Sequence, residues 1–264
     1  MRSVQYAEQL LRSIQNATKE YVAGRAVGVL FSGGLDSTII ARVASEYGPV
    51  SLYTIGIEGA HDLIMGEKTA VELDLPFNPI VLDEKAIIAN LVPLSKLLRD
   101  PSPLPLSYEM PLFVVASLSK EKVLLSGQGA DELFGGYSRY LLLDSDQLAK
   151  GMKQDLENLL LRGVDNEQGI ASHFQKTIHH PYLHPDVIRE AALLPTNQCV
   201  DGQSRKVVLR EVARLLELHQ VADRPKKAAQ YGSGVMRVMK AEAKRLGVGL
   251  RELVPTLEEN EKRA

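Results

Sequence analysis

The sequence has one cysteine, no tryptophan, few other aromatic residues and almost no net charge, and each shortage excludes a class of protein. A single cysteine in 264 residues excludes an internal disulfide framework, a zinc cluster of thiolates and a CxxC redox pair. It is typical of a reducing compartment, so we expect a cytoplasmic protein. Aromatic residues make up 5%, which leaves little material for a base-stacking platform. The net charge of −2 predicts no broad basic surface for nucleic acid.

Long hydrophobic runs are also missing. No stretch approaches the 18 or so uncharged apolar residues of a membrane span, so we expect no membrane association. Residues 1–24 carry several charges and lack the apolar core of a signal peptide. The proportions of hydrophobic (45%) and charged (24%) residues are those of an ordinary globular protein.

The apolar pattern predicts alternating strands and helices in the first half of the chain. Helical periodicity covers 3–20, 39–44, 84–98 and 111–120, with a further helix from Asp62 as its cap, and apolar runs predict strands at 26–31, 50–55, 77–82 and 122–126. The short connections favour a doubly wound parallel sheet with helices on both faces, an α/β fold. The prolines in 99–107 predict an irregular loop, and Pro93 predicts a kink. Val71 is expected on the buried side of its helix.

After residue 140 the spacing is helical, for example at Leu148, Met152 and Leu156, and no further strand pattern is found. We therefore expect an α/β core over 1–140 and a mostly helical portion over 141–264. The second part is expected to pack on the first, so that both form one continuous domain.

The first motif, Ser-Gly-Gly-Leu-Asp-Ser-Thr at residues 32–38, lies between a strand and a helix. Gly33 and Gly34 allow amides to converge on an anion, and the helix N-terminus adds free N–H groups. A carboxylate at Asp36 beside a phosphate site makes sense if Mg²⁺ bridges the two. The plainer interpretation is a strand-to-helix turn with a cap. Hydroxyl donors are supplied by Ser32, Ser37 and Thr38.

Two familiar phosphate motifs do not fit this loop. The Walker pattern requires a lysine, and the dinucleotide fingerprint requires a third glycine where Ser37 stands. The run resembles instead the pyrophosphate-binding loop of the N-type ATP pyrophosphatases, which split ATP between its α and β phosphates.

The second motif, Ser-Gly-Gln-Gly-Ala-Asp-Glu-Leu-Phe-Gly-Gly-Tyr at residues 126–137, follows another strand. Ligands bind beyond the carboxyl ends of parallel strands, so both motifs meet at one edge of the sheet. Asp36 and Asp131 are then directed towards the same metal ion. Acids that open a helix also complement its dipole, but this alternative leaves the glycines unexplained.

With this motif the chain resembles the synthetase domain of the class B asparagine synthetases. The family pattern is Ser-Gly-(Glu/Asp)-Gly-x-Asp-Glu. Residues 180–185 loosely resemble the family's Pro-Phe-Leu-Asp stretch, and the segments at 206–210 and 224–227 resemble its Lys-x-x-Leu-Arg and Arg-Pro-Lys segments. Order and spacing agree from about residue 25 to 235.

The resemblance implies an adenine nucleotide alpha hydrolase-like fold and an AMP-forming ligase of amino-acid biosynthesis. ATP and an aspartate-like carboxylate would give an acyl-adenylate and pyrophosphate, and ammonia would then displace AMP. Asp36 and Asp131 would hold Mg²⁺, and Leu30 and Ile55 would border the adenine. Lys226 would meet the adenylated carboxylate, with Lys227 as the adjacent alternative. The nucleotide would also contact Ser32, Gly33, Gly34, Ser37, Thr38, Ser126, Gly127 and Gln128.

The sequence departs from the family at three positions. Glutamine-using members begin with a glutaminase whose nucleophile is a cysteine exposed after Met1 is removed, whereas residue 2 is Arg2. We therefore expect ammonia from outside the chain, either free or from a separate glutaminase subunit. Gln128 replaces an acid that could accept a proton, which glutamine cannot do. His184 replaces the acid of the Pro-Phe-Leu-Asp pattern.

Three functions follow as hypotheses. The first is the amide ligase, and the second is the same adenylating core with another acceptor, a natural-product carboxylate or a modified nucleoside, as Gln128 suggests. The third is a nucleotide-binding regulator without turnover. A small-molecule carboxylate is the expected partner, and a homo-oligomer is compatible with the sequence. Three further expectations are that Cys199 is buried, that the basic residues 224–227 bind phosphate, and that the histidines at 179, 180 and 184 form no metal site.

Overall fold

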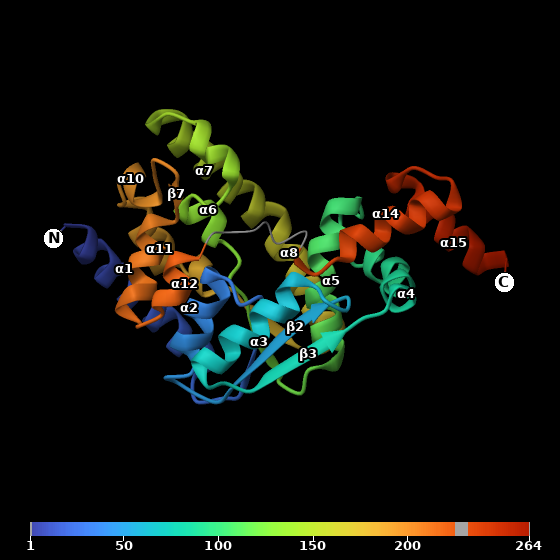
Figure 1. Cartoon of the computed structure of the whole chain (residues 1–264), viewed down its shortest axis with the longest axis horizontal. Helices are drawn as coiled ribbons and strands as arrows, with labels where there is room; N and C mark the ends of the chain where they lie inside the picture. The colour runs from blue at the N-terminus through green and yellow to red at the C-terminus, as the bar shows by residue number, and fades with distance from the viewer. Residues whose placement is uncertain (1, 225–231, 264) are drawn as a thin grey trace.

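The computed structural model describes residues 2–224 and 232–263. Its centre is a five-stranded sheet in the order β3-β2-β1-β4-β5, in which all neighbouring strands are parallel. The strands are β1 (Val27–Leu30), β2 (Val50–Gly56), β3 (Phe77–Val81), β4 (Val123–Leu125) and β5 (Thr177–His179). The doubly wound α/β fold predicted from the sequence is confirmed (Figure 1).

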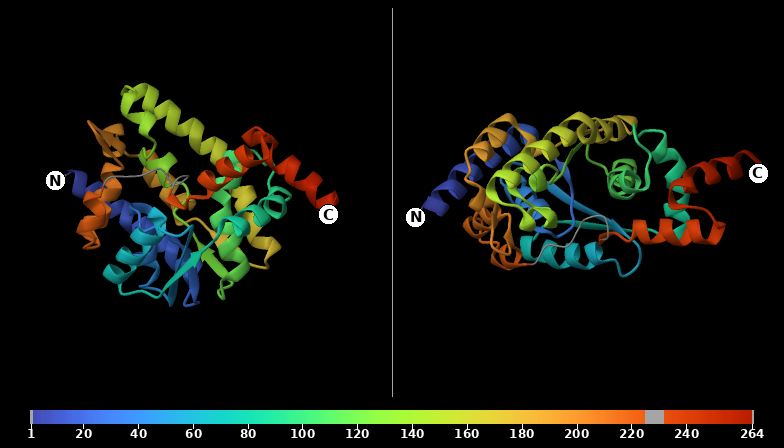
Figure 2. Two further views of the ribbon diagram at one scale, coloured as in Figure 1. Left: turned by 45° about the vertical axis from the view of Figure 1, so that its right-hand side comes forward. Right: turned by 90° about the horizontal axis from the view of Figure 1, so that it is seen from above.

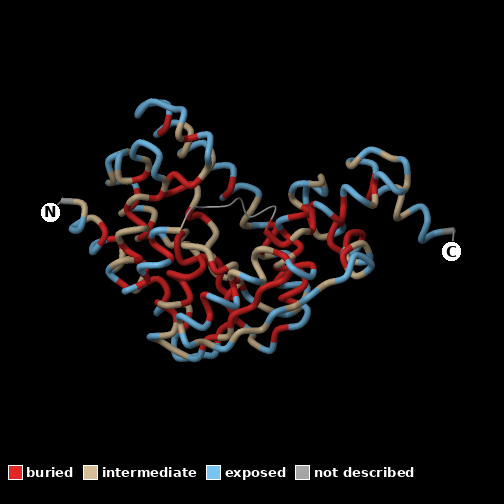
Figure 3. The backbone as a smooth tube through the Cα atoms, viewed as in Figure 1, coloured by how far each residue is buried: buried red, intermediate tan, exposed pale blue. Residues whose placement is uncertain are grey.

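Helices cover both faces of the sheet because its strands are apolar on both sides. Val27 and Val29 of β1 belong to one buried cluster, which includes residues of α1 (Arg2–Val22), α2 (Leu35–Ala44) and α3 (His61–Leu73). Leu124 and Ile178 belong to the other, with residues of α4 (Glu84–Ser95), α5 (Pro103–Leu118) and α8 (Val164–His173). The protein therefore has two hydrophobic cores, one on each side of the sheet, and buried backbone runs along the middle of the molecule (Figure 3).

The second half of the chain adds helices at both ends of this core. α11 (Val207–Leu215) and α12 (His219–Asp223) pack near α1 and α2, whereas α14 (Val235–Leu246) and α15 (Leu253–Arg263) pack on α4 (Figures 1 and 2). Before α11 the chain forms several short elements, which are α6 (Ala130–Phe134), η1 (Ser138–Leu142), α7 (Ser145–Asn158), the π turn η2 (Leu159–Gly163), η3 (Pro181–Leu183), α9 (Pro185–Ala192), α10 (Thr196–Cys199) and the hairpin β6 (Val200–Asp201) and β7 (Ser204–Arg205). A short η4 (Leu250–Glu252) precedes α15. In the described parts of the chain, no helix is both long and apolar enough to cross a membrane.

The expectation that no strand follows residue 140 is wrong. β5 pairs with β4 in parallel register, with Val123 opposite Thr177 and Leu125 opposite His179. The strand has only three residues, of which Ile178 alone is fully buried, so it shows no readable periodicity. The sheet therefore draws on chain from both sides of residue 140.

Three local expectations in the first half also need correction. The loop expected over 99–107 is partly helical, because α5 begins at Pro103, where the first turn requires no backbone N–H donor. α4 continues past Pro93 and ends at Ser95. Asp62 lies inside the first turn of α3, whose cap position is Ala60, and Val71 is 76% exposed.

Candidate active site

A cavity lies where the strand order reverses. The chain passes outward from β1 through β2 to β3 and then returns to β4 on the other side of β1. Such a switch point is where open parallel sheets bind ligands. The cavity has a volume of about 310 Å³ and is lined by both glycine–acid loops. The predicted site residues that line it are Leu30, Ser32, Gly33, Gly34, Asp36, Ser37, Ile55, Ser126, Gly127, Gln128 and Asp131.

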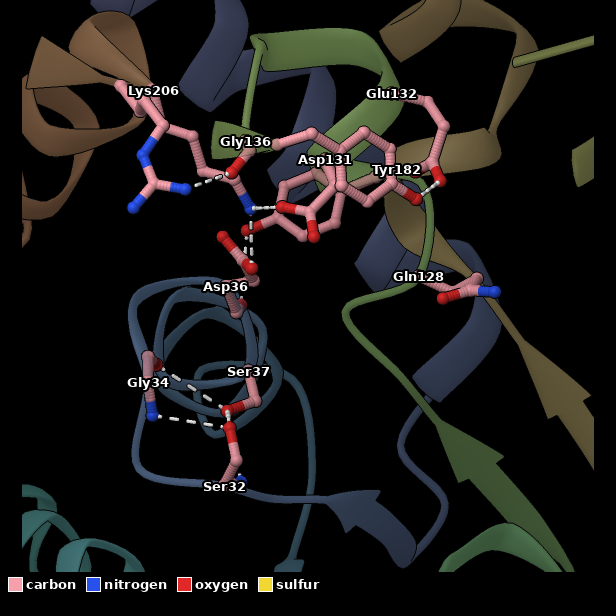
Figure 4. Close-up of polar contacts among 12 residues, drawn as sticks. Ser32, Gly34, Asp36, Ser37, Gln128, Asp131, Glu132, Gly136, Tyr182 and Lys206 are labelled. Atoms are coloured by element: carbon pink, nitrogen blue, oxygen red, sulfur yellow. Dashed lines mark hydrogen bonds and ion pairs between the residues drawn. The ribbon is translucent and has the colours of Figure 1, made fainter. Parts of the chain in front are cut away.

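The first loop forms a cradle of donors at the start of α2. The hydroxyl oxygens of Ser32 and Ser37 are 3.3 Å apart, and the amide of Gly34 donates to the Ser32 hydroxyl (Figure 4). Gly33 has φ +67°, and a Cβ there would lie 2.3 Å from the carbonyl oxygen of Met65, so only glycine fits. Thr38 departs from the prediction, because it is fully buried and does not line the cavity.

Lys206 joins the two predicted metal-binding aspartates. Its Nζ lies 2.6 Å from Oδ2 of Asp36 and 2.5 Å from Oδ1 of Asp131, and its side chain is only 2% exposed (Figure 4). Burial lowers the pKa of the Lys206 ammonium, but the carboxylates of Asp131 and Asp36 outweigh burial, so that the pKa is raised. The sequence correctly predicted that the two acids meet, but it did not predict the lysine between them.

The surrounding backbone is shaped to admit this lysine. Lys206 precedes α11 with φ +57°, a conformation that is costly for a residue with a side chain. The hydroxyl of buried Tyr182 donates to the carbonyl oxygen of Asp36 at 3.1 Å. A Cβ on Gly136 would lie 1.9 Å from Oδ1 of Asp131 and 2.3 Å from Cε of Lys206. The glycine at 136 therefore leaves the space that the ion pair occupies.

Gly136→Ala should destabilise the protein by about 1–3 kcal/mol, because the added methyl group must push Asp131 and Lys206 apart. Urea denaturation measures the effect. Gly151→Ala in α7 is the matched control, since a Cβ there would make ordinary contacts at 3.6 Å, and it should be neutral or slightly stabilising. Equal stability of the two variants would contradict the proposed packing.

The aspartates suit the magnesium ion that the sequence predicts. Mg²⁺ takes oxygen ligands, and it commonly uses one or two protein carboxylates and completes its shell with water and phosphate oxygens. Asp36 and Asp131 supply two such groups, and both line the same cavity as Ser32 and Ser37. Lys206 is then a second cation at the same oxygens. Within residues 2–224 and 232–263 there is no group of three or more metal-binding side chains.

Arg224 ties the end of α12 to the first loop. One of its guanidinium nitrogens donates to the carbonyl oxygen of Gly33 at 2.7 Å and to the hydroxyl of Thr69 at 3.0 Å. Arg210 donates in turn to the carbonyl oxygen of Arg224 at 3.1 Å. Both arginines line the cavity, and Arg224 belongs to the basic segment that was predicted to bind phosphate. Lys226, which was predicted to be catalytic, and Lys227 lie outside the described residues.

Another part of the cavity is acidic. Burial, reinforced by Glu132, raises the pKa of Glu167 to about 8. Burial and the charge of Glu167 raise the pKa of Glu109 well above its ordinary value. Burial also raises the pKa of Glu132, against the effect of the Tyr137 hydroxyl, which donates to its carboxylate. Glu132 and Glu167 thus line this part of the cavity, Glu109 is buried behind it, and burial raises the pKa of all three carboxyl groups.

The sequence missed both Lys206 and Glu167. Lys206 had a usable signal, because it begins the segment that resembles Lys-x-x-Leu-Arg. Glu167 had none, since an acid on an amphipathic helix is normally expected in solvent. Gln128, which departs from the family pattern, points away from Lys206 and Asp36 (Figure 4).

The three histidines of 179–184 have separate partners. His179 stacks on Tyr21 with ring centroids 4.2 Å apart, and His184 caps α9 by accepting from the amide of Asp186. Nδ1 of His180 lies 2.8 Å from the Ser126 hydroxyl. Burial, with the charge of His179, lowers the pKa of His180 to about 4, so its ring is neutral near pH 7.

Cys199 is buried, as predicted. Its side chain is 3% exposed, and burial raises the pKa of its thiol to about 12. A thiol in this environment remains protonated and inert.

A doubly wound sheet with two glycine–acid loops at its switch point is the arrangement in which open α/β proteins bind ligands. Residues 6–166 match the family described as asparagine synthase. A putative glutamine-hydrolysing asparagine synthetase from Methanocaldococcus jannaschii is 31% identical, over 93% of this chain and 53% of its own length. The asparagine synthetase domain-containing protein YML096W of Saccharomyces cerevisiae is 24% identical, over 88% and 52%. The NMN synthetase structure from Francisella tularensis aligns with 97% of this chain and 86% of its own, at 12% identity and a TM-score of 0.47.

The chain belongs to the asparagine synthase family. It spans about half the length of the curated relatives described above.

Proposed function

We propose that this chain adenylates a small-molecule carboxylate with ATP, releases pyrophosphate, and then amidates the adenylate with ammonia supplied from outside the chain. The observation that supports this most strongly is the meeting of both glycine–acid loops and Lys206 in one cavity. An aspartate-like acid is the first candidate substrate, because the Methanocaldococcus relative named as an asparagine synthetase matches 93% of the chain.

The residues of the cavity fall into the roles that this reaction needs. Negative charge grows on the phosphates as the bond between the α and β phosphates breaks, so positioned donors and cations lower the barrier. The hydroxyls of Ser32 and Ser37 and the N-terminal end of α2 would hold the pyrophosphate. Lys206 carries a fixed positive charge a few ångströms from both aspartates.

Two parts of the site complete this assignment. Mg²⁺, held by Asp36 and Asp131, would neutralise phosphate charge when bound. Leu30 and Ile55 give the cavity apolar walls suited to adenine. Lys226 is kept as the proposed lysine that meets the adenylated carboxylate, with Lys227 as its neighbour in the sequence.

Incubation with ATP, Mg²⁺, ammonium chloride and a panel of carboxylates, with L-aspartate first, tests the proposal. Pyrophosphate, AMP and amide should appear in equal amounts with at least one carboxylate. Ser37→Ala should slow pyrophosphate release by roughly 10–100-fold, because one donor to the transferring phosphate is lost. No pyrophosphate release across the whole panel would contradict the proposal and favour a nucleotide-binding regulator without turnover.

Gln128 supports a second candidate function, in which the same adenylating core acts on another acceptor. A glutamine amide cannot accept a proton from an incoming amine, whereas the carboxylate of the family pattern at this position can. The substrate that reacts with ATP in this chain can therefore differ from that of the family. A natural-product carboxylate or a modified nucleoside would be such an acceptor. Untargeted mass spectrometry of reactions with cell extract would identify a new adenylated or amidated compound.

The nitrogen source and the assembly are further proposals. Free ammonia or ammonia from a separate glutaminase subunit would serve the amidation. Addition of glutamine without ammonia should then give no amide with this chain alone. Light scattering measures whether the chain forms a homo-oligomer.

A further inference from the structure

Glu167 is a buried carboxyl group that lines the cavity. Its side chain is 8% exposed, and its Oε2 makes no hydrogen bond to any described residue. Nε2 of His180 lies 3.1 Å from this oxygen but is not aligned for a hydrogen bond. A buried polar atom normally has a partner in the folded protein, so one left without it at a cavity wall indicates a place for a ligand.

Glu167 also lies next to the position where the family pattern has an acid. Nε2 of Gln128 is 3.8 Å from the point where a Cβ on Gly163 would stand. Residues 163 and 167 are four apart at the start of α8, and therefore lie on one face of the helix. The π turn η2, which ends at Gly163, is a feature frequent at functional sites. The carboxyl of Glu167 thus follows the amide of Gln128 along the cavity wall.

We propose that Glu167 accepts the proton of the amine nucleophile, and that the wall formed by Glu132 and Glu167 is where this amine binds. The inference rests on the proposed function, of which it specifies the second half. Ammonia enters neutral, and its nitrogen forms a bond to the acyl carbon of the adenylate. The bond from that carbon to the phosphate oxygen breaks, and its electron pair leaves with AMP. The excess proton on nitrogen passes to the ionised carboxylate of Glu167, which becomes a neutral carboxyl group.

The neighbours of Glu167 suit a proton acceptor. Glu109 and Tyr108 of α5 and Glu132 of α6 interact with it electrostatically, and His180 approaches it from the segment after β5. Tyr137 donates to the carboxylate of Glu132. The His180 ring is held by the Ser126 hydroxyl, and its lowered pKa keeps it neutral near pH 7, so it places no positive charge beside the Glu167 carboxylate. The pKa of Glu167, about 8, gives both the ionised and the protonated form near neutral pH.

Two measurements on Glu167→Gln separate this role from adenylation. Carboxylate-dependent exchange of radiolabelled pyrophosphate into ATP reports the first half-reaction, and amide formation from ammonium chloride reports the second. The probe is L-aspartate, or the member of the panel that supports exchange. We expect exchange within about threefold of the parent protein and amide formation reduced roughly 100-fold or more, as for loss of a general base. Asp165→Asn, an exposed isosteric change on the same helix, is the control and should change neither.

Restoring an acid elsewhere on the wall provides the second test. Glu167→Gln combined with Gln128→Glu should recover amide formation at least about tenfold over Glu167→Gln alone, because position 128 then supplies the acceptor. Hydroxylamine is already neutral near pH 7, so its own protonation does not limit the reaction there. With this nucleophile the rate of product formation by the parent protein should still rise as the pH increases through about 8, because Glu167 ionises, and Glu167→Gln should lack this rise.

The outcomes distinguish the two proposals. No exchange by the parent protein with any carboxylate would overturn the proposed function and this inference with it. Exchange and amide formation that fall together in Glu167→Gln, or an unchanged rate of amide formation, would overturn the role of Glu167 alone.

Discussion

Replacement of both Asp36 and Asp131 by asparagine should destabilise the protein by about 3–5 kcal/mol and abolish pyrophosphate release. The reason is Lys206, whose ammonium is almost completely buried and held by both carboxylates. Without the two carboxylates the buried ammonium loses their attraction and is still not hydrated. Removing one partner of a buried ion pair typically costs about 3–5 kcal/mol of stability for this reason. Urea denaturation at constant pH measures the change.

The triple variant, with Lys206→Met added, should recover most of that stability and none of the activity. Methionine is similar in length and apolar, and well-packed apolar groups replace buried ion pairs at little cost. The parent protein and Lys206→Met alone are the controls. If the triple variant is as unstable as the double one, the lost stability does not come from the stranded ammonium. If it releases pyrophosphate, the acid pair and Lys206 are not part of the reaction.

The convergence of Asp36 and Asp131 could be predicted from the sequence because both follow adjacent parallel strands. Each lies in a glycine-rich loop directly after an apolar run, and the geometry of a parallel sheet brings such loops to one edge. Lys206 reaches the same point from 170 residues beyond Asp36. Its approach depends on a positive φ at 206 and on the missing side chain at Gly136, and neither can be inferred from the local pattern.

The limits of the fold prediction have the same origin. β5 contains three residues and is identified by its pairing with β4, a long-range contact, and by no periodicity of its own. Pro103 and Pro105 of α5 are typical of a loop, but they fall in its first turn, where a helix tolerates them. The burial of Glu167 likewise results from the packing of α8 against α5, whereas its sequence neighbours predict an exposed position.

Between pH 6.5 and 8 the ionisation of Glu167 should lower the stability of the protein by about 2 kcal/mol, and Glu167→Gln should reduce the total loss over this range by that amount, whereas the contribution of Glu109, whose pKa is also raised, should remain. In the unfolded chain a glutamate ionises near its ordinary pKa of 4.5, whereas burial raises the pKa of Glu167 in the folded protein to about 8. The folded state therefore holds an extra proton between these values, and its stability falls by about 1.36 kcal/mol per pH unit as the pH rises. The protonated Glu167 therefore makes its full contribution to the stability of the folded protein below pH 4.5, and this contribution is lost by about pH 8.

His180 has the opposite effect in a lower window. Its pKa is lowered from 6.5 to about 4, so the unfolded chain binds the extra proton there and stability rises as the pH rises from 4 to 6.5. The two slopes offset each other below pH 6.5, which leaves the loss due to Glu167 visible above it. Urea denaturation at closely spaced pH values, with Asp165→Asn as the control, measures this difference.

Parallel stability curves for the parent and Glu167→Gln would show that Glu167 is already ionised in the folded protein. A carboxyl group that destabilises the folded state above pH 6.5 has no structural advantage over glutamine at the same position. The same ionisation produces the carboxylate that can accept a proton from an amine. The loss of stability and the rise in amide formation should therefore occur over one pH range, because both measure the deprotonation of Glu167.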